Sequence, residues 1–479
     1  MTADIAVFGL GVMGSNIALN MADHGHHVAV YNHTSSLTER FLKMTTKQQK
    51  ITACYDIEQM VLVLTKPRII FLMVTAGSVV DQVIDTLTSY LDSGDIIIDG
   101  GNSHYPDTER RCKSLKQQGF RFLGMGISGG EEGARHGPSI MPGGDPEAWP
   151  YVESIFQSIA AKADDGESCC QWVGEGGAGH YVKMVHNGIE YGDMQLIAEA
   201  WHIMKDGLGL TSDQLADTFA QWNKGKLSSY LIEITAAILR VREPDGMPRV
   251  ENILDSAGQK GTGRWTAIDS LQLGVPLTLI CESVYARALS SMKKERQIAA
   301  KKLGARPSAN NEDSKALLSS IEDALYAAKI ISYAQGFMQM REAAKEYNWN
   351  LEFGNIALLW REGCIIRSRF LNDIKHAYEK NPELQNLLLD DFFATAIQSA
   401  EQGWRDTISF AVHQAIPLPA MSSALAFYDG YRSDVLPANL LQAQRDYFGA
   451  HTYKRLNDPE NKTYHTHWTH DANEESING

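Results

Sequence analysis

A glycine-rich turn with the sequence GLGVMG, residues 9–14, directly follows an apolar run of strand length, Ile5–Phe8. Residues 15–24 then show the apolar spacing of a helix. A glycine turn between a strand and a helix lets the backbone approach a pyrophosphate closely and points the helix N-terminus at it. The pattern therefore predicts a dinucleotide-binding turn, with a purely structural glycine turn as the alternative.

The first third of the chain alternates apolar runs with helical stretches. Apolar runs of strand length occupy residues 5–8, 28–31, 69–74 and 96–99, the last of which ends in Asp99. Runs that are apolar on both faces are typical of a parallel sheet covered by crossover helices. We therefore expect an α/β, Rossmann-like dinucleotide-binding domain over residues 1–176.

The strand pattern fades near residue 177. Long stretches with helical periodicity follow at residues 193–208, 227–242, 281–303 and 314–347. We expect residues 177–434 to form a large all-α domain that binds substrate and mediates dimerisation.

The last segment, residues 435–479, is expected to be an extended C-terminal tail. From Gln444 it is rich in His, Asn, Tyr, Asp and Thr and poor in aliphatic residues, so it cannot form an apolar core of its own. It is then either disordered or bound to another surface, and its tyrosines, arginines and Trp468 favour docking onto a second subunit. Its histidines 465, 467 and 470 are interpreted as an exposed polar tail rather than a metal site.

Charge and composition exclude several classes of protein. Lys and Arg number 44 against 58 Asp and Glu, a formal net charge of −14, which disfavours binding to nucleic acid or an anionic membrane. The apolar run 69–74 is too short for a membrane helix, and residues 1–4 show no signal-peptide pattern. The six cysteines have no zinc spacing and are too sparse for a disulfide framework. We expect a reduced, cytoplasmic protein in which local basic residues capture any phosphorylated ligand.

The segment 183–191 (KMVHNGIEY) has polar and ionisable residues at i, i+3, i+4, i+7 and i+8, which is one stripe of a helix. Lys183 and Glu190 on this stripe could act as base and acid if burial shifts their pKa values. Gly188 and Gly192 lie beside the stripe and would let a ligand or another backbone come close. The alternative is that the polar stripe 183–191 has no catalytic role and is a solvated helix face.

Two glycine-containing loops are candidates for anion binding. Residues 100–103 (GGNS) follow the predicted strand 96–99 at its carboxyl end, where open α/β sheets bind ligands. Residues 128–134 (SGGEEGA) offer backbone N–H groups that could hold an oxyanion. Either loop could also be only a tight turn.

The end of the second predicted strand indicates which dinucleotide is bound. An acidic residue there would accept a hydrogen bond from the ribose of NAD, but the chain has Asn32, His33 and Thr34 instead. A 2′-phosphate meets no repulsion at this point, so NADP is favoured. A plain polar turn is the alternative.

Five longer motifs stand in order along the chain, at residues 128–135 (SGGEEGAR), 141–144 (MPGG), 183–191 (KMVHNGIEY), 255–263 (DSAGQKGTG) and 444–451 (QRDYFGAH). They resemble the signatures of the decarboxylating 6-phosphogluconate dehydrogenases of the pentose phosphate pathway. Together with the turn at 9–14, the resemblance covers nearly the whole chain. Members of this family are homodimers whose tail inserts into the neighbouring subunit.

The resemblance implies oxidation of 6-phosphogluconate at its 3-hydroxyl by NADP and loss of carbon dioxide to give ribulose 5-phosphate, without a metal. By matched position Lys183 would be the base that takes the hydroxyl proton, and Glu190 would protonate the resulting enediol. The carboxylate and hydroxyl groups would be held by Asn102, Ser128, Gly129, Gly130, His186 and Asn187. The phosphate would be held by Tyr191, Lys260, Thr262, Arg287, Arg445 of the partner subunit and His451 of the partner subunit.

The cofactor segments also match the family by position, with two departures. His33 stands where the family commonly has an arginine for the 2′-phosphate, and Thr75 replaces a common lysine. Both departures remove fixed positive charge, which leaves NAD open as a secondary cofactor. The matched cofactor residues are Gly9, Leu10, Gly11, Val12, Met13, Gly14, Asn32, His33, Thr34, Val74, Thr75, Ala76 and Asn102.

Two other functions fit parts of the pattern. A different 3-hydroxyacid dehydrogenase would share the two-domain plan, but it would not need the phosphate set Lys260, Arg287, Arg445 and His451. A non-catalytic sugar-phosphate sensor would keep the fold, but it would need neither the base Lys183 nor an acid.

Overall fold

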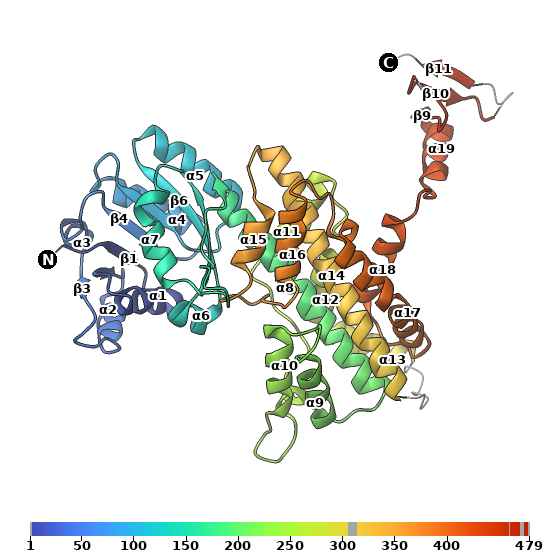
Figure 1. Ribbon diagram of the computed structural model, residues 1–479, viewed down its shortest axis with the longest axis horizontal. Coiled ribbons are helices and arrows are strands. Elements are labelled where there is room, and N and C mark those ends of the chain that lie inside the picture. Colours follow the sequence, from blue (N-terminus) through green and yellow to red (C-terminus); the bar gives the residue numbers. More distant parts are fainter. Residues whose placement is uncertain (1, 305–313, 459, 470–473, 478–479) are drawn as a thin grey trace. The chain divides into compact units, whose positions relative to one another are not determined.

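The computed structural model describes residues 2–304, 314–458, 460–469 and 474–477 (Figure 1). The chain divides into two compact units, residues 1–425 and 426–479. None of the helices in these described stretches combines the length and the apolar character needed to cross a bilayer. All six cysteines are free thiols.

One eight-stranded sheet organises the first 175 residues, in the order β3-β2-β1-β4-β5-β6-β7-β8. Strands β1 to β6 are parallel, β7 is antiparallel to β6, and β8 is parallel to β7. The order 3-2-1-4-5-6 is that of dinucleotide-binding folds. The strands are β1 (Ile5–Phe8), β2 (Val28–Tyr31), β3 (Ile51–Cys54), β4 (Ile69–Leu72), β5 (Ile96–Asp99), β6 (Arg121–Ser128), β7 (Ser139–Gly144) and β8 (Gly174–Glu175).

Both faces of this sheet are covered by helices, which explains the continuous apolar runs. Ile5 and Val7 of β1 join a core with α1 and α7, whereas Ala6 and Phe8 join a second core with α3, α4 and α5. The Rossmann-like class expected from the sequence is confirmed. The helices of this region are α1 (Val12–Asp23), α2 (Ser35–Leu42), α3 (Ile57–Leu62), α4 (Ser78–Thr88), α5 (Tyr105–Gln117), α6 (Gly130–His136) and α7 (Trp149–Ile159).

The rest of the first unit is helical, as expected. The long helices α8 and α14 pack together, and α11 and α12 pack against α8 (Figure 1). The helices are α8 (Ala178–His202), which continues as a π-helical turn (Ile203–Gly207), α9 (Ser212–Trp222), α10 (Tyr230–Arg240), α11 (Thr262–Leu273), α12 (Thr278–Ser291), α13 (Lys293–Leu303), α14 (Ser314–Tyr347), α15 (Phe353–Leu359), α16 (Leu371–Lys380), α17 (Asp391–His413) and α18 (Pro419–Tyr431), with short 3₁₀ turns at Arg249–Asn252 and Leu387–Leu389.

The two glycines beside the polar stripe of α8 face neighbouring helices. A Cβ atom on Gly188 would lie 2.6 Å from Cγ2 of Thr266 in α11, and one on Gly192 would lie 2.5 Å from Oγ of Ser332 in α14. Such approaches are too close for any side chain. These glycines therefore allow a neighbouring helix to pack closely against α8. Of the two possibilities that the sequence left open, close approach of a ligand or of another backbone, the structure shows the second.

The second unit contains the end of α18, helix α19 (Ala438–Gly449) and a small antiparallel sheet with the order β11-β10-β9. Its strands are β9 (Tyr453–Lys454), β10 (Thr463–Thr466) and β11 (Glu474–Ile477). Among its described residues after 431, the buried side chains are Asp446 and Thr466, both polar. These described residues of the tail form no apolar core, which agrees with the sequence, but the helix and sheet give them more order than an extended segment would have. We call residues 438–477, as far as they are described, the tail module.

Candidate active site

A cavity of about 1140 Å³ lies where the carboxyl ends of the sheet strands meet helices α8, α11 and α12. It brings together most of the residues that the sequence proposed for one site. Those lining it are Met13, Val74, Thr75, Ala76, Asn102, Ser128, Gly129, Gly130, Lys183, Asn187, Glu190, Tyr191, Lys260, Thr262 and Arg287.

The glycine turn at residues 9–14 is held in a shape that requires glycine. Gly9 has φ +106°, and a Cβ atom on it would lie 2.5 Å from the Met73 carbonyl oxygen, while one on Gly14 would lie 1.9 Å from the Gly9 carbonyl oxygen. Asn32 steadies the turn by accepting a hydrogen bond from the Leu10 N–H (2.9 Å). Around Gly11, by contrast, no atom lies within 4 Å of a Cβ position. The tight turn with open space at its centre fits the pyrophosphate of a dinucleotide.

Asn102 reaches the cavity from the loop after β5. The Asp99 carboxylate fixes this loop by accepting hydrogen bonds from the Gly101 N–H (3.0 Å) and the Ser103 hydroxyl (2.6 Å). Arg111 adds an ion pair to the same carboxylate at 3.3 Å. These contacts hold the loop, and with it the exposed Asn102 side chain, in a fixed position.

Lys183 is almost completely enclosed, with 5 % of the residue exposed. Burial disfavours its ammonium form and lowers its pKa to about 8, although the negative charge of Glu190 opposes this effect. Its Nζ lies 3.4 Å from Nδ1 of His186. A lysine with a pKa near 8 is neutral in a useful fraction of molecules, so Lys183 can act as a base.

His186 is fully buried behind the cavity and lies between other predicted site residues. Its Nε2 is 3.2 Å from Oγ of Ser128, and its Nδ1 is 3.0 Å from Oδ1 of Asn187. Burial and the nearby Lys183 hold the pKa of His186 well below its usual range. His186 is therefore a neutral ring that orients Ser128 and Asn187, and Asn187 in turn donates to the Thr262 hydroxyl at 3.0 Å.

Glu190 lies one turn beyond His186, with its Oε2 4.0 Å from the ring Nδ1. Burial raises the pKa of Glu190, although Lys183 and Arg287 pull it in the opposite direction. A carboxyl group with a raised pKa can hold a proton and donate it. Lys183 and Glu190 thus share one helix face. Burial lowers the pKa of the lysine and raises that of the glutamate, which suits the first to act as a base and the second as an acid.

The far end of the cavity is basic. The Arg287 guanidinium lies over the Tyr191 ring, 3.6 Å from its centroid, and donates to the Gly258 carbonyl at 3.0 Å. Arg296 binds the Asp255 carboxylate at 3.1 Å and so fixes the start of the motif 255–263, which carries Lys260. This end supplies the local positive charge that an anionic ligand would need.

Other predicted residues lie outside the cavity lining. Two of them, Leu10 and Val12, belong to the glycine turn. Three others, Asn32, His33 and Thr34, form the link between β2 and α2, in which His33 and Thr34 are exposed. Arg445 and His451 lie in the tail module and are exposed. In the same unit, His465 pairs with Asp446 and His467 lies 3.3 Å from Glu475, whereas His470 falls outside the described residues.

The cavity also contains residues that sequence reasoning missed. The rings of His104 and Trp265 are in contact, with their centroids 4.6 Å apart and their planes tilted by 33°, and both line the cavity. His104 directly follows the loop 100–103, and Trp265 lies two residues after the motif 255–263, so nearness to these motifs is the signal that points to them. Ile365 comes from a distant segment, and only the packing of that segment brings it here.

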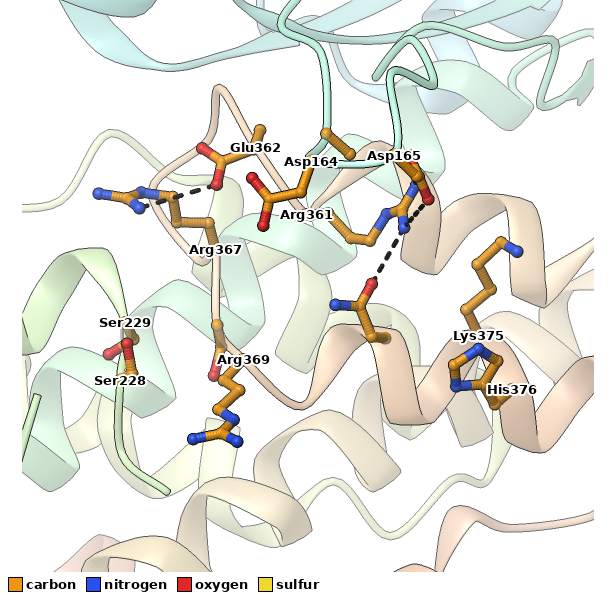
Figure 2. A pocket seen from close by; sticks show the side chains of 13 residues that line it. Asp164, Asp165, Ser228, Ser229, Arg361, Glu362, Arg367, Arg369, Lys375 and His376 are labelled. Atoms are coloured by element: carbon orange, nitrogen blue, oxygen red, sulfur yellow. Dashed lines mark hydrogen bonds and ion pairs between the residues drawn. The ribbon is translucent and has the colours of Figure 1, made fainter. Parts of the chain in front are cut away.

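A second cavity, of about 490 Å³, lies around residues 361–376 (Figure 2). It contains several arginines, but the main ones are already paired. Arg361 binds the Asp165 carboxylate at 2.7 Å, and Arg367 binds Glu233 at 2.7 Å and Glu362 at 3.8 Å. These ion pairs occupy Arg361 and Arg367, and the residues lining this cavity include none of those predicted for the site, so we assign the chemistry to the first cavity.

Comparisons with known proteins give one consistent family. The family model for the "NAD binding domain of 6-phosphogluconate dehydrogenase" matches residues 4–174, and that for "6-phosphogluconate dehydrogenase, C-terminal domain" matches residues 179–468. Decarboxylating 6-phosphogluconate dehydrogenases from Cunninghamella elegans and Homo sapiens are each 58% identical over 468 residues, which is 98% of this chain and 96% and 97% of theirs. The solved 6-phosphogluconate dehydrogenase of Plasmodium falciparum, described in its apo form, with NADP+ and with 6-phosphogluconate, superposes with a TM-score of 0.94 at 42% identity, over 97% of this chain and 100% of that one.

Proposed function

Because the chain belongs to the 6-phosphogluconate dehydrogenase family, we propose that it converts 6-phosphogluconate and NADP into ribulose 5-phosphate, carbon dioxide and NADPH. The observation that carries the proposal is the cavity in which Lys183 and Glu190 share one face of α8 beside the dinucleotide turn. We assign nucleotide binding to residues 1–176, substrate binding and dimerisation to residues 177–434, and tail exchange between subunits to residues 435–479.

Oxidation requires a base at the 3-hydroxyl. Neutral Lys183 takes the hydroxyl proton, and its buried position favours the neutral amine that this step needs. NADP, when bound, accepts the hydride that leaves carbon 3. Asn102 and Asn187 fix the sugar through its hydroxyl and carboxylate oxygens, so that the hydroxyl points at the lysine.

Loss of carbon dioxide follows because the new ketone accepts the electrons of the breaking carbon–carbon bond. The product is an enediol, which needs a proton at the carbon that carried the carboxylate. Glu190, with its raised pKa, donates that proton. No step of this sequence requires a metal ion.

Phosphate recognition completes the site in a homodimer. Tyr191, Lys260, Thr262 and Arg287 hold the phosphate from one subunit, and Arg445 of the partner subunit and the partner's His451 close the site. Arginine suits this role because its planar fork donates two hydrogen bonds to phosphate at once.

The experiment that tests this function compares 6-phosphogluconate with unphosphorylated gluconate. We expect kcat/KM to fall by about 10³-fold or more without the phosphate, since each charge-assisted hydrogen bond is worth about 1.5–3 kcal/mol. Equal activity on both substrates would favour a different 3-hydroxyacid dehydrogenase. Tight binding of 6-phosphogluconate with no turnover would favour the sensor.

Cofactor preference is set in part by His33, and replacement of His33 by arginine tests this. A permanent positive charge should lower the KM for NADP by about tenfold, as expected for one charge-assisted contact to the 2′-phosphate. The KM for NAD, which lacks that phosphate, is the internal control and should stay the same. A variant with unchanged KM for NADP would show that residue 33 does not face the phosphate.

The pH dependence of kcat/KM should report the Lys183 amine. Since the base works in its neutral form and burial lowers the pKa of Lys183 to about 8, kcat/KM should rise about tenfold per pH unit below that value and level off above it. Initial rates at constant ionic strength between pH 6 and 9 give the profile. A flat profile over this range would exclude a lysine base with this pKa.

A further inference from the structure

The tail module is organised around one buried carboxylate. Asp446, near the end of α19, has 0 % exposure. One of its oxygens accepts from the Thr452 N–H (2.9 Å) and faces Nδ1 of His465 (2.9 Å), and the other accepts from the Thr466 N–H (3.0 Å) and the Trp468 indole (2.9 Å). Burial alone would raise the pKa of Asp446, but these hydrogen bonds outweigh it and lower the pKa to about 2. The group is therefore a carboxylate at every pH at which the protein would work.

The same carboxylate controls the turn that carries His451. Ala450 and Thr452, on either side of His451, have φ values of +48° and +58°, a left-handed backbone that non-glycine residues rarely adopt. The Ala450 N–H donates to the Asp446 carbonyl (2.9 Å) and the Thr452 N–H to its carboxylate. The Asp446 side chain thus holds Thr452 on one side of His451, while the main-chain carbonyl of the same residue holds Ala450 on the other side.

The His451 ring folds back over the end of α19. A Cβ atom on Gly449 would lie 2.7 Å from Nε2 of His451, so this approach requires glycine. The Phe448 ring meets the imidazole edge to face, with centroids 5.9 Å apart. Arg445 lies one turn before Gly449 on the same helix, and its guanidinium is steadied by Gln442 at 3.2 Å.

We propose that Asp446 is a positioning residue of the proposed reaction. It does not touch substrate, but it joins α19 to β10 and shapes the 450–452 turn, and so sets the direction in which Arg445 and His451 project toward the phosphate end of a sugar phosphate in the partner subunit. The proposal rests on the proposed function, in which those two side chains bind the phosphate. A merely structural role would hold the small sheet together without setting substrate affinity.

The first test is Asp446→Asn in the full-length protein. An amide places an N–H₂ group where an oxygen now accepts, so at least one N–H donor of the tail module loses its partner. We expect the KM for 6-phosphogluconate to rise about tenfold, the loss of one charge-assisted contact to phosphate, with the KM for NADP unchanged. The matched control is Asp458→Asn, which alters the carboxylate that accepts from the Glu460 and Lys462 N–H groups in the turn before β10 and should leave both KM values unchanged.

A second variant, Gly449→Ala, separates positioning from folding. Alanine is the better helix former, so a purely structural role predicts a tail that is at least as stable and an unchanged KM. The added methyl group must displace the His451 ring, so positioning predicts a raised KM for 6-phosphogluconate. In the His451→Ala background, Gly449→Ala should raise the KM for 6-phosphogluconate no further, because the ring that the methyl group would displace is absent.

Two results would overturn the inference. One is a wild-type KM for 6-phosphogluconate in Asp446→Asn, whatever Gly449→Ala shows. The other is a Gly449→Ala effect that persists unchanged in the His451→Ala background. A wild-type protein that does not turn over 6-phosphogluconate at all would instead mark a failure of the proposed function.

Discussion

Replacement of Lys183 by methionine should lower kcat by about 10³-fold, within the range of roughly 10²–10⁴ that a general base contributes. Methionine has a similar length and fills the buried position without an amine, so the helix face keeps its shape. NADP binding, followed by protein fluorescence, should be nearly unchanged, because the glycine turn at residues 9–14 lies on separate elements. The steady-state rate of NADPH formation measures the loss.

Lys183→Arg is the matched control for charge. A guanidinium keeps the positive charge but stays protonated, so it cannot take the hydroxyl proton. If Lys183 is the base, the arginine variant should be as inactive as the methionine variant. Substantial activity in Lys183→Arg would assign the residue to substrate binding, and wild-type activity in Lys183→Met would remove it from the mechanism.

Replacement of Glu190 by glutamine should lower the steady-state rate by about 10²-fold or more, the usual contribution of a general acid. Glutamine preserves the shape of the side chain but has no acidic proton for the enediol. Oxidation and loss of carbon dioxide precede this protonation. Rapid mixing should therefore show a burst of one NADPH per site, followed by slow turnover.

The burst distinguishes two roles for Glu190. If the Glu190→Gln variant shows no burst and hydride transfer is as slow as steady-state turnover, Glu190 acts in the oxidation step. That result would contradict its assignment to enediol protonation. An unchanged steady-state rate would exclude it as the acid. Circular dichroism of the variant checks that α8 remains folded.

Local patterns explain why much of the sheet and of the site could be predicted from the sequence. The strand at residues 69–72 is apolar throughout because both its faces are covered, and such a run needs no tertiary information to be recognised. Lys183, His186 and Glu190 share a stripe because helix geometry alone aligns positions three and four apart. The structure places these predicted features where the sequence indicated.

Features that depend on tertiary packing could not be predicted. Gly188 and Gly192 face neighbouring helices, which no periodicity within α8 reveals. Ile365 reaches the cavity only because its segment packs there. In the tail, the sequence showed too few apolar residues for a core, but not that Asp446 would collect four hydrogen-bond donors and order a helix and a sheet around itself.

The most direct test of this account is the stoichiometry of the reaction with 6-phosphogluconate labelled with ¹³C in its carboxylate. Purified protein with NADP should release labelled carbon dioxide and NADPH in equal amounts, and ribulose 5-phosphate should accumulate at the same rate. NADPH without labelled carbon dioxide would show a simple hydroxyacid dehydrogenase. The absence of both products from folded protein would contradict the assigned reaction altogether.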